Sequence, residues 1–205
     1  MPKAVFFDFG GVITSSPFDA IARYESTLGA PSGFVASVNS RNPADNAWAK
    51  IERNEISVEE FDRLFREETR ALGLEISGAE LLPLLTGEVR EEMVAAIDVL
   101  KDHGLIVACL TNNVLTANPS PRLAVLLAKF DFVVESSKVN VRKPERRFYE
   151  IACELARVEP AECVFLDDLG INLKTARQMG MTTIKVSNTE QALRELSETV
   201  GVELW

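Results

Sequence analysis

Short apolar runs alternate with helix-like segments from about residue 89 to the end of the chain. Two of these runs, LIVACL at residues 105–110 and CVFL at residues 163–166, are apolar at every position. A strand with one solvent-exposed face would alternate apolar and polar side chains, so these runs must be covered on both faces. The pattern therefore predicts an α/β fold, with a parallel sheet between two helical layers in a three-layer, Rossmann-like core.

Five segments have the length and composition of strands in this core. A helix-like pattern follows or precedes each of them, as a parallel sheet with crossover helices requires. The predicted strands are residues 3–8, 105–111, 131–136, 163–168 and 182–187.

The alternation is interrupted between about residues 17 and 85. Residues 18–29, 44–55 and 57–73 there read as amphipathic helices, and Ser57 with Glu60 three positions later has the pattern of a capping box. We predict that residues 17–85 form an all-helical cap, inserted in a core made of residues 1–16 and 86–205. A cap at this point lies over the carboxyl end of the first strand, where open parallel sheets bind ligands.

The overall charge limits the classes of partner. The chain has 22 Lys plus Arg against 31 Asp plus Glu, a formal charge of -9, which repels nucleic acid and anionic membranes. A run of about 18 apolar residues, as a membrane span needs, does not occur. We expect a cytoplasmic protein, monomer or homodimer, whose three cysteines are buried free thiols. An anionic small substrate would need a local positive site.

Polar side chains occur where the predicted strands and loops end. In a parallel sheet these ends lie at one edge, so we expect the side chains to converge. Taken singly, each has an ordinary explanation as a turn, a loop or a helix start. For Lys143 this explanation is a helix that begins at the next residue, Pro144. Together and in this order they predict one site. Its members are Asp8, Thr111, Asn112, Lys143, Asp167 and Asp168.

The four segments VFFDFGG, ACLTNN, NVRKPE and VFLDDLGIN, in this order, resemble the four motifs of the haloacid dehalogenase superfamily. The stretch from residue 165 to residue 196 is similar to the N-terminal phosphatase domain of soluble epoxide hydrolases. The resemblance spans nearly the whole chain, cap included. It implies a hydrolase that acts on small phosphorylated substrates through an aspartyl-phosphate intermediate.

The resemblance also implies a role for each motif residue. Asp8 would be the nucleophile, and Lys143 would neutralise charge on Asp8 and on the phosphate. The Thr111 hydroxyl and the backbone N–H of Asn112 would donate to phosphate oxygens. The cofactor would be Mg²⁺, a cation that prefers oxygen ligands. Its ligands would be Asp8, the main-chain carbonyl of Gly10 and Asp168, with Asp167 beside them.

The chain departs from the family pattern at Gly10. Most phosphatases of the superfamily have a second aspartate there, which protonates the leaving oxygen and then activates water. Glycine keeps the main-chain metal contact and loses the proton shuttle. Three alternatives follow: a phosphatase in which water, a cap residue or a good leaving group fills the gap; a phosphate-binding module without turnover; or a haloacid dehalogenase. The paired acids at residues 167 and 168 favour the first.

Overall fold

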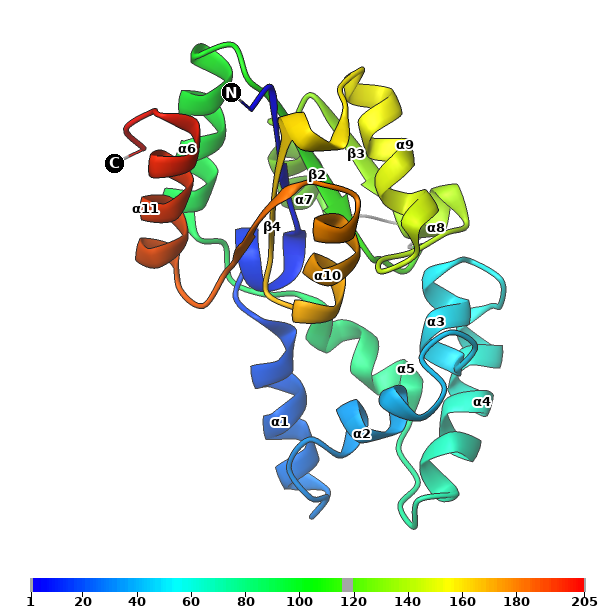
Figure 1. Cartoon of the computed structure of the whole chain (residues 1–205). Helices are drawn as coiled ribbons and strands as arrows, with labels where there is room; N and C mark the ends of the chain where they lie inside the picture. The colour runs from blue at the N-terminus through cyan, green and yellow to red at the C-terminus, as the bar shows by residue number, and fades with distance from the viewer. Residues whose placement is uncertain (1, 116–119, 205) are drawn as a thin grey trace.

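The computed structural model describes residues 2–115 and 120–204 of the chain. Five parallel strands form one sheet in the order β3-β2-β1-β4-β5 (Figure 1). The predicted parallel sheet is therefore confirmed, and every strand lies within one or two residues of its predicted bounds. These bounds are Ala4–Phe7 (β1), Ile106–Thr111 (β2), Phe132–Glu135 (β3), Cys163–Asp167 (β4) and Thr182–Lys185 (β5).

The two faces of the sheet carry separate apolar clusters. Val5 and Phe7 of β1 pack in one cluster, which is covered by α6 (Glu91–Asp102), α7 (Pro121–Leu127) and α11 (Thr189–Val200). Phe6 packs in the other, under α9 (Arg146–Ala156) and α10 (Gly170–Gln178). Figure 1 shows α6 and α11 on one side of the sheet and α9 and α10 on the other. The sequence is apolar on both alternations because both faces are covered.

The strand register brings three polar residues to one edge. Phe7 pairs with Cys109 of β2 and with Leu166 of β4, and the N–H of Asp8 donates to the Leu166 carbonyl at 2.8 Å. Asp8 therefore follows β1 at the level where β2 and β4 end. Thr111 and Asp167 are the last residues of those two strands.

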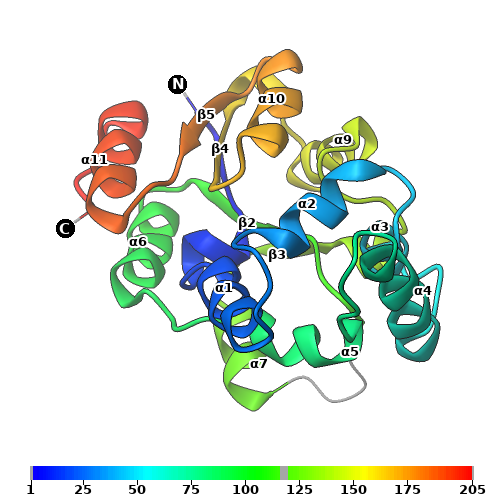
Figure 2. The same cartoon turned by 90° about the horizontal axis from the view of Figure 1, so that it is seen from below.

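The helices of the predicted cap have an apolar cluster of their own, in which Phe61 and Phe65 are buried and Trp48 packs against both. They lie beyond the carboxyl end of β1 (Figures 1 and 2). We retain residues 17–85 as a proposed boundary for this unit. Among the described residues, no helix has the length and apolar character to cross a bilayer. The cap elements are α1 (Pro17–Thr27), α2 (Phe34–Arg41), α3 (Ala47–Glu52), α4 (Val58–Arg70), α5 (Gly78–Leu81) and η2 (Leu82–Leu85).

The two linkers between the cap and the core run side by side. Thr14 and Val89 form an antiparallel bridge, and Ser15 N–H donates to the Glu88 carbonyl at 2.7 Å. A Cβ at Gly87 would lie 2.4 Å from the Ser15 carbonyl oxygen, so this close approach requires glycine. Paired linkers fix where the cap leaves and rejoins the core.

Two local predictions are wrong. Ser57 does cap α4, accepting from the Glu60 N–H at 3.2 Å, but the Glu60 carboxylate bonds Arg63 and does not close a capping box. The helix expected at Pro144 begins at Arg146. The backbone before it forms a turn, in which Glu145 N–H donates to the Arg142 carbonyl at 2.7 Å.

Candidate active site

A buried ammonium joins the first and fourth strands. The Lys143 Nζ lies 2.7 Å from an oxygen of Asp8 and 2.8 Å from an oxygen of Asp167. Lys143 is only 1% exposed and lies 5.5 Å from the centre of the Phe165 ring. Burial lowers the pKa of Lys143, but the charges of Asp167 and Asp8 outweigh burial and raise it. The group is a fixed cation at neutral pH.

Asp167 is fully engaged by donors of the core. Its Oδ1 accepts from the backbone N–H of Leu169 at 2.8 Å, and the amide of Asn172 donates to both of its oxygens, at 3.1 and 3.0 Å. Asn172 lies in the stretch that resembles soluble epoxide hydrolases, where a hydrogen bond to the acid pair is expected, and this bond is present. The buried Tyr149 hydroxyl in turn donates to the Asn172 carbonyl at 2.9 Å. Asp167 therefore holds Lys143 in place, with little capacity left for a further ligand.

Asp168 completes a group of three carboxylates. One oxygen each of Asp8, Asp167 and Asp168 lies within 4.8 Å of the other two. The pKa of Asp8 is raised to about 8, mainly by burial, with Lys143 opposing. Burial and then the charge of Asp167 raise the pKa of Asp168 to about 6. Crowded oxygen ligands with excess negative charge fit a hard divalent cation such as Mg²⁺.

Two glycines follow Asp8 in the tight turn η1 (Phe9–Ile13), and they have different functions. Gly10 has φ -71° and ψ 130°, and a Cβ there would meet Pro17 Cδ at 3.6 Å, an ordinary contact. Gly11 has φ +79°, and a Cβ there would lie 2.2 Å from an oxygen of Asp168. Only a residue without a side chain lets Asp168 lie against the turn. The sequence around Gly11 has no local signal for this contact, because Asp168 lies in a distant segment.

Replacing Gly11 by alanine is expected to displace Asp168 and, if the acidic group holds Mg²⁺, to weaken the binding of this cation. The left-handed backbone conformation adds a destabilisation of about 1–3 kcal/mol. Gly29→Ala is the matched control, because Gly29 also has a positive φ, +67°, but nothing within 4 Å of an added Cβ. Calorimetric titration with Mg²⁺ and urea unfolding measure the two effects. Equal Mg²⁺ affinity in the two variants would contradict the assignment of Gly11.

Arg90, at the end of the second linker between cap and core, hydrogen-bonds to the same turn. Its guanidinium donates to the Gly11 carbonyl at 2.8 Å, and its backbone N–H donates to the Ile13 carbonyl at 2.9 Å. Its positive charge also opposes the rise in the pKa of Asp168. The turn that holds Asp168 is thus anchored from the cap linker as well as from the sheet.

Thr111 and Asn112 lie at the end of β2. The Thr111 hydroxyl is half-buried and donates to the Asn112 carbonyl at 3.3 Å. The Asn112 side chain binds the main chain of Lys143 in both directions: its oxygen accepts from the Lys143 N–H at 2.8 Å, and its amide donates to the Lys143 carbonyl at 3.0 Å. The family resemblance implies a role only for the backbone N–H of Asn112. The side chain has a separate function, which is to position Lys143.

The loop that contains Lys143 is also bound to the cap. Arg142 pairs with the buried Glu52 at 2.5 Å, and Trp48 donates to the same carboxylate at 3.0 Å. Asn140 donates to the Arg53 carbonyl at 2.9 Å. Figure 1 shows α3 next to α8 (Ser136–Val139) at this contact.

Three arginines near Lys143 in the sequence form a basic cluster, a pattern that is typical of a solvated face: Arg142, Arg146 and Arg147. Arg146 and Arg147 do pair with acids on the surface of α9. For Arg142 the interpretation is wrong, because its side chain is 17% exposed and joins cap to core.

Comparisons with known proteins find a matching family model, similar sequences and similar structures. A family model described as haloacid dehalogenase-like hydrolase matches residues 2–180. Over 98% of the chain, the sequence is 33% identical to bifunctional epoxide hydrolase 2 of Sus scrofa. The chain spans between 19% and 39% of the length of the first curated relatives it matches.

Two further comparisons cover both proteins almost completely. A sesquiterpene phosphatase of Aspergillus oryzae is 27% identical over 97% of each chain. A solved structure of a predicted HAD-like family hydrolase from Porphyromonas gingivalis superposes with a TM-score of 0.69, at 22% identity and 98% coverage of each chain. That identity supports the fold alone.

Proposed function

The chain belongs to the haloacid dehalogenase-like hydrolase family, and from this premise we propose that it is a Mg²⁺-dependent phosphohydrolase of small phosphorylated metabolites. The observation that supports the proposal most is the Asp8–Lys143–Asp167 arrangement, with Asp168 packed against Gly11 at the same edge. A phosphatase among the relatives that match the full length of the chain adds support.

Asp8 is the proposed nucleophile. Its carboxylate sits at the tip of a fully buried strand, and one oxygen is held by the Phe9 N–H at 2.6 Å and by Lys143 at 2.7 Å. Attack of Asp8 on phosphorus forms the aspartyl-phosphate as the bond to the leaving oxygen breaks, and that oxygen takes its proton from water to leave as an alcohol. A second water then attacks phosphorus, which releases inorganic phosphate and regenerates Asp8. A rigid carboxylate favours in-line transfer because little orientational freedom remains to be lost.

Positive charge and hydrogen-bond donors would bind the phosphate. Lys143 neutralises part of the charge that develops as Asp8 and the phosphate approach each other. The Thr111 hydroxyl and the Asn112 N–H are the proposed donors to phosphate oxygens. The Asn112 side chain keeps the Lys143 loop at the same strand end.

The proposed Mg²⁺ ligands are Asp8, the Gly10 carbonyl and Asp168, with Asp167 beside them. When bound, the cation supplies charge neutralisation between the carboxylates and the phosphate. Asp168 has the freer oxygens of the acid pair, since Asp167 is already saturated by Lys143, Leu169 and Asn172.

A phosphatase screen of the purified chain tests the proposal. Sugar, acyl, nucleotide and aryl phosphates are supplied with Mg²⁺ and then with EDTA, and released phosphate is measured. We expect Mg²⁺-dependent release from at least one class, abolished by EDTA. If no class is hydrolysed, the phosphohydrolase proposal fails. Mg²⁺-dependent thermal stabilisation by the same esters would then indicate a binding module.

Gly10→Asp is expected to restore the missing proton shuttle. The space at Gly10 accepts a side chain, since a Cβ makes only ordinary contacts there. A positioned acid contributes roughly 10²–10⁴ in rate, and most where the leaving group is poor. The kcat/KM for alkyl phosphates should therefore rise much more than for p-nitrophenyl phosphate.

Gly10→Asn is the control for this variant, because it adds a side chain of the same size without an acid. An equal effect of Gly10→Asp on both substrates, or the same gain with Gly10→Asn, would contradict the loss of a proton shuttle. The measurement is steady-state phosphate release at saturating Mg²⁺.

A further inference from the structure

Two of the three cysteines face each other far from the acidic site. The Sγ atoms of Cys153 on α9 and Cys163, the first residue of β4, are 4.0 Å apart, and both thiols are free. Cys109 packs in the cluster on the opposite face of the sheet. The Cys153–Cys163 pair is thus separated from the third thiol by the sheet itself, and Cys109 serves as an internal control.

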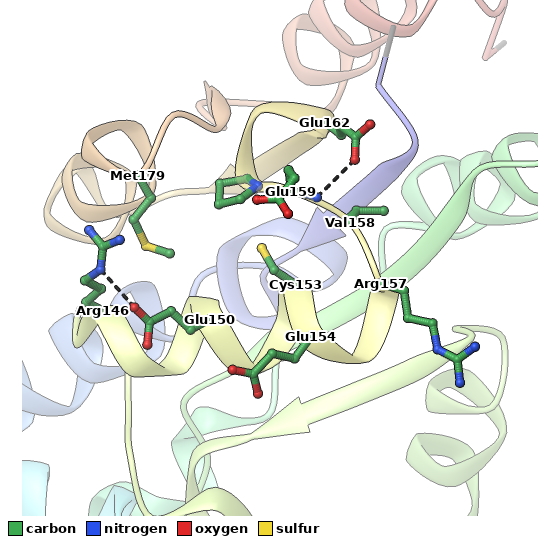
Figure 3. Close-up of a pocket in the computed structure, with 10 residues that line it drawn as sticks. Arg146, Glu150, Cys153, Glu154, Arg157, Val158, Glu159, Glu162 and Met179 are labelled. Atoms are coloured by element: carbon green, nitrogen blue, oxygen red, sulfur yellow. Dashed lines mark hydrogen bonds and ion pairs between the residues drawn. The ribbon is translucent and has the colours of Figure 1, made fainter.

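The cavity beside this pair gives small molecules a route to one of the sulfurs. It has a volume of about 450 Å³, and Cys153 is part of its lining together with Val158 and Met179. In Figure 3 the Cys153 sulfur points from α9 toward the loop that contains Val158 and Glu159. Cys163 is 1% exposed and is not part of the lining. A reagent that enters the cavity therefore meets Cys153 first.

The contact between the sulfurs and burial change the pKa values of the two thiols in different directions. In this contact either sulfur can be the donor. The contact lowers the pKa of Cys153, whereas the same contact and burial raise the pKa of Cys163. The thiolate is the reactive form of cysteine. Because only Cys153 borders the cavity, its position assigns Cys153 as the attacking and Cys163 as the resolving thiol, and the lowered pKa of Cys153 agrees with this assignment.

We propose that Cys153 and Cys163 are a peroxide-sensitive thiol pair, which oxidises reversibly to an intramolecular disulfide between α9 and β4. The Cys153 thiolate attacks one peroxide oxygen, the O–O bond breaks, and the leaving hydroxide takes up a proton to form water. The Cys163 sulfur then attacks the Cys153 sulfenic acid, an S–S bond replaces the S–O bond, and a second water leaves. Two thiols lose two electrons and two protons, and one peroxide becomes two waters.

The second step needs the two sulfurs to move closer together. A disulfide bond is about 2.05 Å long, so the sulfurs must approach by roughly 2 Å. Cys153 borders the cavity, so its side chain has space to move. The pair sits at the amino end of β4, whereas Asp167 is the last residue of that strand. The modification is therefore independent of the proposed phosphatase reaction, and its test needs no substrate.

Peptide mapping of the full chain tests the pair. The protein is treated with a small excess of hydrogen peroxide, denatured, alkylated with N-ethylmaleimide and digested with trypsin. Arg157 lies between the two cysteines, so cleavage there leaves them on separate peptides. We expect peptides 148–157 and 158–174 joined by a disulfide and Cys109 alkylated, with reversal by dithiothreitol.

Variants assign the two roles. Cys163→Ser should accumulate a sulfenic acid on Cys153 that dimedone traps, and Cys109→Ser should give the same disulfide as the wild type. Three alkylated thiols after peroxide, a disulfide between two chains, or oxidation of Cys109 as fast as Cys153 would each overturn the proposal. If Cys163→Ser fails to fold, the peptide maps of the wild type and of Cys109→Ser can still overturn the proposal.

Discussion

Asp8→Asn lowers kcat by roughly 10⁴-fold or more and leaves the fold intact, if Asp8 is the nucleophile of the proposed reaction. An amide cannot form the aspartyl-phosphate. Its oxygen can still accept from the Phe9 N–H and from Lys143, the two donors that hold the carboxylate. Loss of turnover would therefore reflect chemistry and not misfolding. The measurement is phosphate release with any ester that the wild type hydrolyses.

Stability at different pH values gives Asp8→Asn a second readout, in EDTA. Burial raises the pKa of Asp8 from 3.8 to about 8 in the folded protein. Between these values the folded state binds a proton that the unfolded chain has released, so wild-type stability falls as the pH rises. Asparagine does not titrate. The free energy of unfolding of the variant should therefore equal or exceed that of the wild type, with the larger gain at the higher pH.

Asp102→Asn is the control, because it makes the same chemical change at an exposed position at the end of α6. It should alter neither turnover nor the pH profile of unfolding. Mg²⁺-dependent turnover retained by Asp8→Asn would assign the reaction to another group. An unchanged pH profile would contradict the costly burial of the Asp8 carboxylate.

The sheet could be predicted from sequence because its signal is local. LIVACL and CVFL are apolar on both alternations, and both faces are in fact covered. Helix α2 has no such signal. Its N-cap is Gly33, without a side-chain cap, and its first N–H groups are satisfied by Glu25 of α1, which accepts from Gly33 and Val35 at 2.8 Å each. This capping is a tertiary contact, which the sequence of α2 does not encode.

The candidate site likewise has one part that the sequence predicts and one part that it does not. The strand ends could be placed from sequence, because parallel strands align their carboxyl ends. The function of Gly11 could not be predicted from sequence, because the need for glycine arises from Asp168, more than 150 residues away along the chain. The pairing of Glu52 with Arg142 depends likewise on the docking of the cap. Local composition predicts elements and their ends, whereas contacts between distant segments require the fold.

Lys143→Met is expected to affect both stability and turnover strongly. It leaves the carboxylates of Asp8 and Asp167 buried without the ammonium that bridges them at 2.7 and 2.8 Å. Removing one partner of a buried ion pair typically destabilises by about 3–5 kcal/mol. Loss of a fixed charge beside the phosphate should also lower kcat by about 10²–10³. Urea unfolding and phosphate release measure the two losses separately.

The pH dependence identifies the cause of the destabilisation. Without the ammonium the pKa of Asp8 rises further, so its folded-state proton is held more tightly. The loss of stability should therefore be largest at high pH and shrink as the pH falls. Adding Asp167→Asn to Lys143→Met removes one of the facing charges and should recover part of the stability, which a double-mutant cycle quantifies.

Lys138→Met is the matched control for Lys143→Met. Lys138 pairs with Glu135, but its side chain is 63% exposed, and exposed pairs contribute only about 0–1 kcal/mol. If Lys143→Met were no less stable than Lys138→Met, the ammonium would not be what holds the two carboxylates together. Since Lys143 joins the strand with the proposed nucleophile to the strand with the acid pair, that result would also remove the main support for a shared catalytic site.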